Sequence, residues 1–368
     1  MMSARLAPWR RGYIAAVTAP ACATQAWAAE PGTLPLTPTT VGAALRSAHA
    51  CGALDLPLPG GGSTLQRWQA LAELAAADLS LARLVEGHAD AVAILAELDQ
   101  SGSAAPAPTG VWGVWAAEPP GTQLHAVRDK SGWRLTGRKP WCSGAGLIDR
   151  ALITAHAEDG RRLFAVTVAD TIPVPGTWAA VGMAASGSLA VDLDGVAATA
   201  VGGPRAYLER PGFWHGGAGV AACWYGGALG AARTLLSAGR RRDLGPHALA
   251  HLGAVDAVVT GLSTQLRAAA AQIDDDPRDA AGQAELRARR LRAGVEAGAT
   301  EVLDRVGRAL GAGPLCLDPV HAQRAADLPV YLRQSHAERD LAALGALAAR
   351  QAGWDADWGI PVDGDVGW

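Results

Sequence analysis

The stretch WRLTGRKPWCSGAG, residues 133–146, decides the fold because it joins two extended segments and ends in a glycine-rich bend. Its pattern predicts strand, turn, strand and bend, with Trp141 two positions before the hydroxyl of Ser143. Two interpretations are open for this arrangement. It is either ordinary packing within a β-domain or one wall of a cofactor site.

Residues 109–208, which surround this stretch, predict a small antiparallel β-domain. Short apolar-rich runs alternate with turn signals such as DKSG at 129–132 and Asp194-Gly195. No long helical period interrupts them. Regularly spaced short strands of this kind are typical of a barrel-like domain.

Helical patterns flank the β-domain on both sides, so the sequence predicts a multi-domain α+β fold. Residues 1–108 form an N-terminal helical domain, with amphipathic stretches at 41–51 and 65–98. Ser63 or Thr64 is the candidate N-cap of the second stretch. Residues 209–368 predict a C-terminal antiparallel helical bundle. Its four helices are expected at 216–241, 244–273, 280–311 and 327–350.

Composition excludes several classes of protein. The 368 residues are 49% hydrophobic and 18% charged, with a net charge of −3 and no long basic block, so nothing favours a nucleic acid partner. Five scattered cysteines without CxxC spacing argue against a disulfide framework and against a metal site. Reduced thiols indicate a cytoplasmic protein.

The first 29 residues resemble a signal peptide, with early arginines and a small-residue run at 26–28. The apolar stretch is interrupted by Thr18, Pro20 and Thr24. We therefore expect no cleavage and a cytoplasmic location. No window approaches the roughly 20 apolar residues of a membrane span.

The order of helices, strands and helices, together with five local motifs, resembles the acyl-CoA dehydrogenase flavoprotein superfamily. The resemblance implies bound FAD, an acyl thioester or related substrate, and assembly into homodimers or homotetramers. The motifs are AAEPPGT at 116–122, residues 133–155, residues 176–196, residues 240–257 and GRALGAGPL at 307–315.

The same resemblance implies that Trp141 and Ser143 lie against the flavin ring. A flat indole can cover the tricycle and exclude water, and a hydroxyl or backbone N–H can stabilise its hydride-accepting atom. The family usually has a hydroxyl residue before the Glu of the AAEPPGT motif, and here that place is Ala117. Flavin contacts at Ala116 and Ala117 would then come from backbone atoms, with Glu118 as a salt-bridged or capping carboxylate.

Two further motifs match positions that reach the cofactor of a neighbouring subunit in the family. Arg241, in RRRDLG, would contact the FAD pyrophosphate or adenine, although a solvated basic helix end explains it equally well. Gly311 and Gly313 would let backbone approach the partner's FAD. A helix C-cap is the competing interpretation of these glycines.

The catalytic Glu of the family is absent. Residues 331–336 lack the expected Tyr-Glu-Gly, and the second family location, around 218–222, has no carboxylate. His336 and His215 are the candidate replacement bases, because His titrates near neutrality. The main hypothesis is FAD-dependent α,β-dehydrogenation of an acyl thioester. The alternatives are a flavin-dependent monooxygenase of the same fold and a non-catalytic binding or scaffold subunit.

Overall fold

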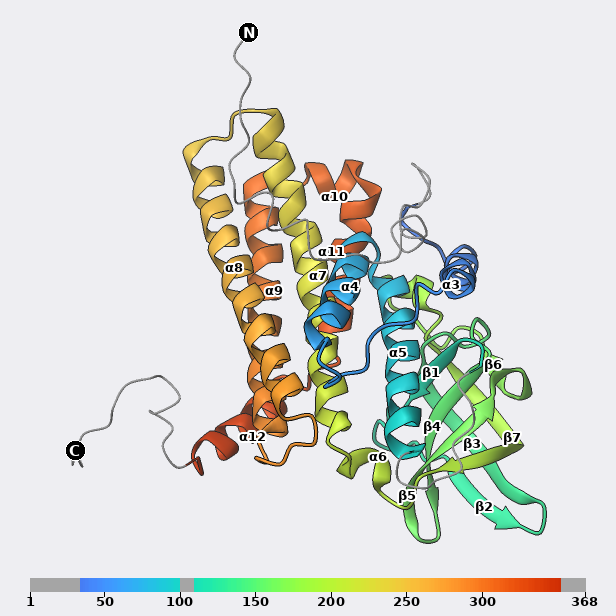
Figure 1. The fold of residues 1–368 in the computed structure, drawn as a ribbon. Coiled ribbons are helices and arrows are strands. Elements are labelled where there is room, and N and C mark those ends of the chain that lie inside the picture. Colours follow the sequence, from blue (N-terminus) through green and yellow to red (C-terminus); the bar gives the residue numbers. More distant parts are fainter. Residues whose placement is uncertain (1–33, 100–108, 352–368) are drawn as a thin grey trace, which may run out of the picture.

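The computed structural model describes residues 34–99 and 109–351. The signal-like segment and the whole 101–108 connector lie outside these ranges. The described chain is a mixed α+β structure, in which a curled sheet lies on one side of helix α5 and long helices lie on the other (Figure 1). One large apolar core runs through the helices and the sheet.

Three helices precede the sheet: α3 (Val41–Ala50), α4 (Thr64–Ala77) and α5 (Leu79–Asp99). The predicted single stretch at 65–98 is therefore two helices. The break is at Asp78, whose backbone is extended and whose Oδ1 accepts the N–H of Leu81 at 2.8 Å. This carboxylate caps α5 and allows the chain to change direction.

The start of α4 is capped from a distant helix. Ser63 occupies the N-cap position but makes no capping bond with its side chain. Instead, the Asp274 carboxylate accepts hydrogen bonds from the Thr64 hydroxyl at 2.6 Å and the Thr64 N–H at 3.0 Å. The end of the bundle and the first helical part are thereby tied together.

Seven strands form one sheet, in the order β1-β4-β2-β3-β7-β5 with β6 paired to β7. An additional β4–β5 pairing closes a ring of five strands, so the predicted barrel-like character is confirmed. The strands are β1 (Trp112–Trp115), β2 (His125–Asp129), β3 (Gly132–Cys142), β4 (Arg150–Ala157), β5 (Gly160–Thr167), β6 (Ile172–Val174) and β7 (Leu189–Val201).

The sequence had predicted a purely antiparallel sheet, and this prediction is wrong. β1 pairs with β4 in parallel, with Trp112 opposite Arg150 and Trp115 opposite Ile153. Parallel neighbours need a crossover connection, which the β2–β3 hairpin and the turn after it supply. Strand periodicity alone carries no information on this direction.

The C-terminal helices match the predicted bundle except at its end. The predicted fourth helix at 327–350 is broken between Leu332 and Glu338, where Ala337 has a φ of 45° and the His336 N–H is accepted by Asp340. The helices are α6 (Ala206–Glu209), α7 (Gly212–Arg241), α8 (Pro246–Asp275), α9 (Ala284–Leu310), α10 (Gly313–Leu317), α11 (Pro319–Leu332) and α12 (Glu338–Ala348).

Two glycines allow very close contacts. A Cβ at Gly226 of α7 would lie 2.2 Å from the carbonyl oxygen of Ala72 on α4. A Cβ at Gly182, in the segment before β7, would lie 2.1 Å from the carbonyl oxygen of Ala326 on α11. In the second contact, the backbone of the segment before β7 touches the backbone of the bundle.

Within the described ranges, no helix is both long and apolar enough to cross a membrane.

Candidate active site

Trp141, at the end of β3, is held in an uncommon conformation. Its backbone has a φ of 56°, and 53% of its surface is exposed. A non-glycine residue in the left-handed region costs on the order of 1 kcal/mol or more, and such strain gathers at ligand sites. An exposed indole in this conformation is the feature expected of a surface that a flat ligand covers.

The turn after Trp141 is fixed by hydrogen bonds on several sides. The Ser143 carbonyl accepts the indole N–H of Trp115, the last residue of β1, at 2.9 Å. The Ser143 hydroxyl lies 2.9 Å from that of Ser188, which lies 2.7 Å from that of Ser186. The turn is thus held at Ser143 through both its carbonyl and its hydroxyl.

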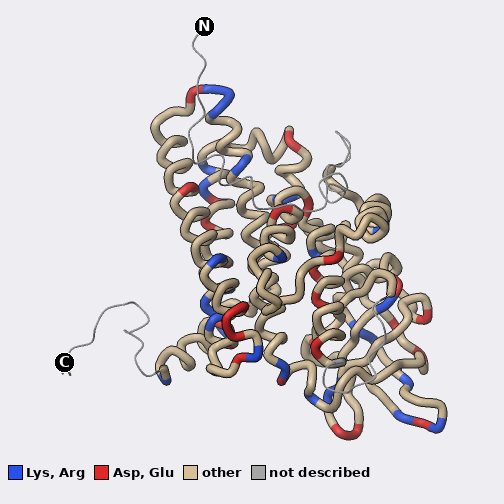
Figure 2. The backbone as a smooth tube through the Cα atoms, viewed as in Figure 1, with Lys and Arg blue, Asp and Glu red and all other residues tan. Residues whose placement is uncertain are grey.

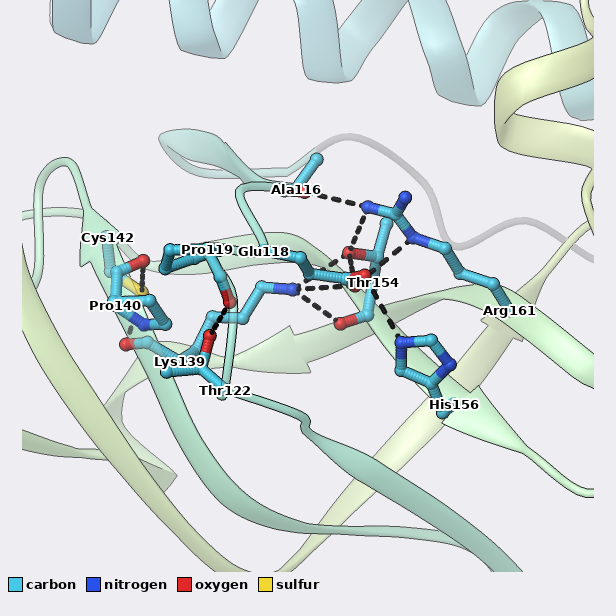
Figure 3. Close-up of polar contacts among 10 residues, drawn as sticks. All are labelled: Ala116, Glu118, Pro119, Thr122, Lys139, Pro140, Cys142, Thr154, His156 and Arg161. Atoms are coloured by element: carbon cyan, nitrogen blue, oxygen red, sulfur yellow. Dashed lines mark hydrogen bonds and ion pairs between the residues drawn. The ribbon is translucent and has the colours of Figure 1, made fainter.

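The segment after β1 is held by a network around Glu118 (Figure 3). Arg161 donates a hydrogen bond to the carbonyl of Ala116 at 2.8 Å and pairs with Glu118 at 3.1 Å. Buried Lys139 contacts the Glu118 carboxylate at 3.2 Å and the Thr154 carbonyl at 2.8 Å. The backbone at Ala116 is therefore fixed.

The charge state of Glu118 follows from these contacts. Burial alone would raise the pKa of Glu118, but the Lys139 cation and the Thr154 hydroxyl outweigh it and leave the pKa below its usual value. Glu118 is thus an ionised, fully engaged carboxylate, as the sequence had indicated. Its role is to hold the segment that carries Ala116 and Ala117.

Helix α5 packs directly against the Ser143 turn. A small cavity of about 10 Å³, about the space of one water molecule, lies between them. Arg83 and Gly87 of α5 line it together with Val114 and Ser143. One wall of the candidate site is therefore supplied by α5.

A buried charged cluster on α4 and α5 adjoins this wall, and sequence reasoning missed it. Arg83 pairs with Glu86, and Arg67 pairs with Asp90 at 2.9 Å. Burial raises the pKa of Glu86 to about 7, with the Asp90 carboxylate adding to the effect and Arg83 opposing it. In the sequence these charges look like the solvated face of an amphipathic helix. The one available signal is that Arg83, Glu86 and Asp90, spaced by three and four, lie on the same face of α5.

Both predicted bases make their described contacts within the C-terminal helical part. His336 is 63% exposed at its side chain and lies 3.7 Å from the Asp340 carboxylate. His215 is buried near the start of α7, where its Nε2 lies 3.0 Å from the carbonyl oxygen of Pro277. Burial lowers the pKa of His215. The contacts described for these residues join neither of them to Trp141 or Ser143.

The predicted partner-facing residues gather at one end of the bundle. Arg241 is exposed in the last turn of α7, where basic residues cluster beside the turn into α8 (Figure 2). Gly311 ends α9 with a φ of 65°, and Gly313 begins α10 at the same end of the molecule (Figure 1). Gly311 thus occupies the C-cap position of α9, where its N–H donates to the carbonyl of Gly307 at 2.8 Å. In residues 34–99 and 109–351, no cluster of His, Cys, Asp or Glu could hold a metal ion.

Comparison with solved structures shows which proteins share this fold. The helix–barrel–helix arrangement is shared over nearly the whole chain with enzymes that include monooxygenases, and it is consistent with the acyl-CoA dehydrogenase fold. No family model matches the chain, and no curated protein matches it in sequence.

Three solved structures illustrate the likeness. TdsC of Paenibacillus sp. A11-2, a dibenzothiophene monooxygenase solved with FMN and indole, has 18% identity and a TM-score of 0.73 over 90% of this chain and 97% of its own. Methanesulfinate monooxygenase MsuC of Pseudomonas fluorescens has 17% identity and a TM-score of 0.71, covering 95% and 98%. Nitrososynthase of Micromonospora carbonacea var. africana has 18% identity and a TM-score of 0.72, over 90% of this chain and 97% of its own. Identities this low establish the fold alone.

Proposed function

We propose that this protein is a flavin-dependent monooxygenase of the acyl-CoA dehydrogenase fold. The observation that carries the proposal is the exposed, conformationally strained Trp141 beside Ser143, in a fold shared with monooxygenases. When bound, reduced flavin supplies the electrons for activating molecular oxygen. The proposed flavin wall consists of Trp141, Ser143 and the backbone at Ala116 and Ala117.

The residues of this wall suit a flavin ring. The indole of Trp141 offers a flat apolar face, and the Trp115–Ser143 bond fixes the turn that would meet the polar edge of the ring. Arg161 fixes the carbonyl of Ala116, so the neighbouring backbone is preorganised for contact. These side chains would position the ring and exclude water from one of its faces.

Dehydrogenation of an acyl thioester has less support than oxygen chemistry. It requires a carboxylate at the substrate carbon, and neither 331–336 nor 218–222 carries one. The turn at 333–337 instead carries Arg333, Gln334 and Ser335. Of the enzymes of the same fold named above, TdsC is a dibenzothiophene monooxygenase and MsuC a methanesulfinate monooxygenase, which favours the monooxygenase alternative.

The choice of flavin is part of the proposal. TdsC was solved with FMN, and we expect FMN to bind here through the Trp141–Ser143 wall. FAD would additionally need contacts for its adenine half, for which Arg241, Gly311 and Gly313 of a second copy are the proposed source. Arg241→Ala would then weaken FAD binding and leave FMN binding unchanged.

The test supplies enzymatically reduced FMN and oxygen to the full chain, with indole, dibenzothiophene and methanesulfinate as probe substrates. The expected result is a product containing one atom from labelled molecular oxygen, formed only when reduced FMN is present. Bleaching of bound flavin by butyryl-CoA without oxygen would instead support the dehydrogenase. Failure to bind either FMN or FAD would exclude both enzymes and favour the scaffold hypothesis.

A further inference from the structure

Three serine hydroxyls form a hydrogen-bonded chain that leads from the proposed flavin wall into the core. The Ser143 hydroxyl lies 2.9 Å from that of Ser188, and the Ser188 hydroxyl lies 2.7 Å from that of Ser186. Ser186 then donates to the carbonyl oxygen of Met183 at 2.7 Å. Ser186 and Ser188 are 1% and 4% exposed, whereas Ser143 is half-buried. Only the outer end of the chain can therefore meet a ligand.

The direction of every hydrogen bond in this serine chain is set at its inner end. A carbonyl oxygen can only accept, so the single hydrogen of the Ser186 hydroxyl points to Met183. Ser186 can then only accept from Ser188. Ser188 has one hydrogen and has given it to Ser186, so it can only accept from Ser143. The Ser143 hydroxyl therefore has no hydrogen left for a ligand and offers only its oxygen lone pairs.

Backbone hydrogen bonds hold the serines at this spacing. The N–H of Gly144 donates to the carbonyl of Ser186 at 2.8 Å, and the N–H of Ala145 donates to that of Gly187 at 3.2 Å. The turn after β3 and the segment before β7 are thus joined through their main chains. Either buried serine can lose its hydroxyl without separating the two segments.

The inner end of the serine chain is anchored to the bundle. The Met183 N–H donates to the Asp327 carboxylate of α11, which also accepts the side-chain amide of Gln323 at 2.7 Å. Met183 has a φ of 57°, which is uncommon for a residue with a side chain. Reversing the serine chain would require the Ser186 hydroxyl to leave the Met183 carbonyl. The direction derived above is the one that keeps every bond.

Resting on the flavin function proposed above, we propose that Ser186 and Ser188 are positioning residues that make Ser143 a hydrogen-bond acceptor toward the flavin. The ring nitrogen that accepts the hydride carries a lone pair when flavin is oxidised and an N–H when it is reduced. An oxygen that can only accept meets a second lone pair in the first case and gains a hydrogen bond in the second. The wall therefore favours reduced flavin.

A preference for reduced flavin suits the proposed reaction. A monooxygenase supplied with reduced flavin from solution must release the oxidised form, so weaker binding of that form favours turnover. The serine chain can reverse to meet oxidised flavin at the cost of the Ser186–Met183 bond, so the preference is limited to about one hydrogen bond, or roughly tenfold in affinity. Tenfold tighter binding of the reduced form raises the two-electron midpoint potential of bound flavin by about 30 mV.

The test measures FMN binding to the full chain, apart from any turnover. Fluorescence quenching gives the dissociation constant of oxidised FMN, and equilibration with a reference dye without oxygen gives the midpoint potential of bound FMN. Ser188→Ala frees the hydrogen of Ser143 to donate to the oxidised ring. We expect oxidised FMN to bind about tenfold tighter in this variant and the midpoint potential to fall by about 30 mV. Loss of a merely structural hydroxyl would not tighten binding.

Three further variants locate the effect. Ser186→Ala should repeat both changes, because Ser188 can then donate to Ser143 instead. Ser143→Ala should weaken the binding of reduced FMN about tenfold and leave that of oxidised FMN nearly unchanged. Ser80→Ala is the matched control, since Ser80 is a serine of α5 that is 1% exposed and lies outside the serine chain. It should behave as the unmodified protein.

An analogue identifies the ring atom that Ser143 meets. In 5-deaza-FMN a C–H group replaces the hydride-accepting nitrogen, so the oxidised analogue has no lone pair to accept a hydrogen bond there. Ser188→Ala should therefore tighten the binding of oxidised FMN and leave that of 5-deaza-FMN unchanged. Equal tightening of both compounds would contradict the contact with this nitrogen.

Each outcome decides between the proposals. An unchanged midpoint potential, or oxidised FMN bound no more tightly, in whichever of Ser186→Ala and Ser188→Ala folds overturns the positioning role. If oxygenated product forms without these shifts, the monooxygenase proposal stands and the serine proposal fails. If the shifts appear but reduced FMN and oxygen give no oxygenated product, the serine proposal stands and the monooxygenase proposal fails. Failure to bind FMN in either form overturns both.

Discussion

The indole N–H of Trp115 donates a hydrogen bond to the carbonyl oxygen of Ser143 at 2.9 Å, joining the end of β1 to the turn after β3. These residues lie 28 positions apart in the chain, and the strands they follow or end, β3 and β1, are not direct neighbours in the sheet order. The bond brings the Ala116 segment and the Ser143 turn into one surface. Both halves of the proposed flavin wall therefore depend on it.

Trp115→Phe should weaken this surface. The change leaves the Ser143 carbonyl without its indole donor, so we expect the free energy of unfolding to fall by about 1–3 kcal/mol and FMN binding to weaken. Denaturant unfolding and FMN fluorescence quenching measure the two effects. Trp133→Phe, which keeps an aromatic ring against Phe164, is the control. Equal effects of the two variants would show that the Trp115–Ser143 bond has no special role.

Trp141→Gly should separate binding from stability. Glycine tolerates a φ of 56° without strain, so we expect the free energy of unfolding to stay within about 1 kcal/mol of the original. FMN binding should weaken at least about tenfold, because the flat indole surface is gone. Val127→Ala removes another exposed apolar side chain, on β2, and should change neither quantity. Unchanged FMN affinity in Trp141→Gly would remove Trp141 from the site.

Glu118→Gln should destabilise the protein in a pH-dependent way. The change leaves buried Lys139 without its carboxylate partner, which costs on the order of 3 kcal/mol. The pKa of Glu118 is lower in the folded state than in the unfolded state, so its contribution is present above the unfolded value and lost as the pH falls through the folded one. The difference between variant and original should therefore shrink in acid.

Asp192→Asn is the matched control for the Glu118 variant. It breaks an exposed pair with Arg138 on the same sheet, and solvent screening leaves such pairs little effect on stability. Urea unfolding at several pH values compares the two. A loss in Glu118→Gln no larger than in Asp192→Asn would mean that the network does not hold the Ala116 segment.

Asp327→Asn should stabilise the protein at high pH, which is the opposite of the effect expected for Glu118→Gln. Burial raises the pKa of Asp327 from 3.8 to about 6, so burying the charged form destabilises the protein increasingly as the pH rises from about 4 to above 6. One Asp327 oxygen accepts both the Met183 N–H and the Gln323 amide, and an Asn oxygen can accept the same two donors. We expect a gain on the order of 2 kcal/mol near pH 8 and none near pH 4. A constant difference across pH would contradict this assignment.

Much of the fold could be predicted because it follows local periodicity. The helices around 41–51, 216–241, 244–273 and 280–311 lie close to their predicted bounds. The break at Asp78 was missed because a continuous amphipathic period hides an extended capping residue. The parallel β1–β4 pairing was missed because strand direction depends on contacts far apart in sequence.

The site was only partly predictable, for a physical reason. The Trp141–Ser143 pattern is local, so the resemblance could select it, and the structure adds its strained backbone and its bond to Trp115. The buried Arg83–Glu86 pair could not be selected, because its burial comes from helices that lie far away in sequence. The identity of the flavin, the assignment of the base and the assembly into dimers or tetramers stay predictions.

The contact between Gly182 and Ala326 limits how the sheet can move relative to the bundle. Any side chain larger than hydrogen at position 182 would press on the α11 backbone and move the sheet away from the bundle. The same helix carries Tyr331. Substitutions at 182 would therefore change the spacing between the sheet and α11 while every residue of the proposed flavin wall stays the same.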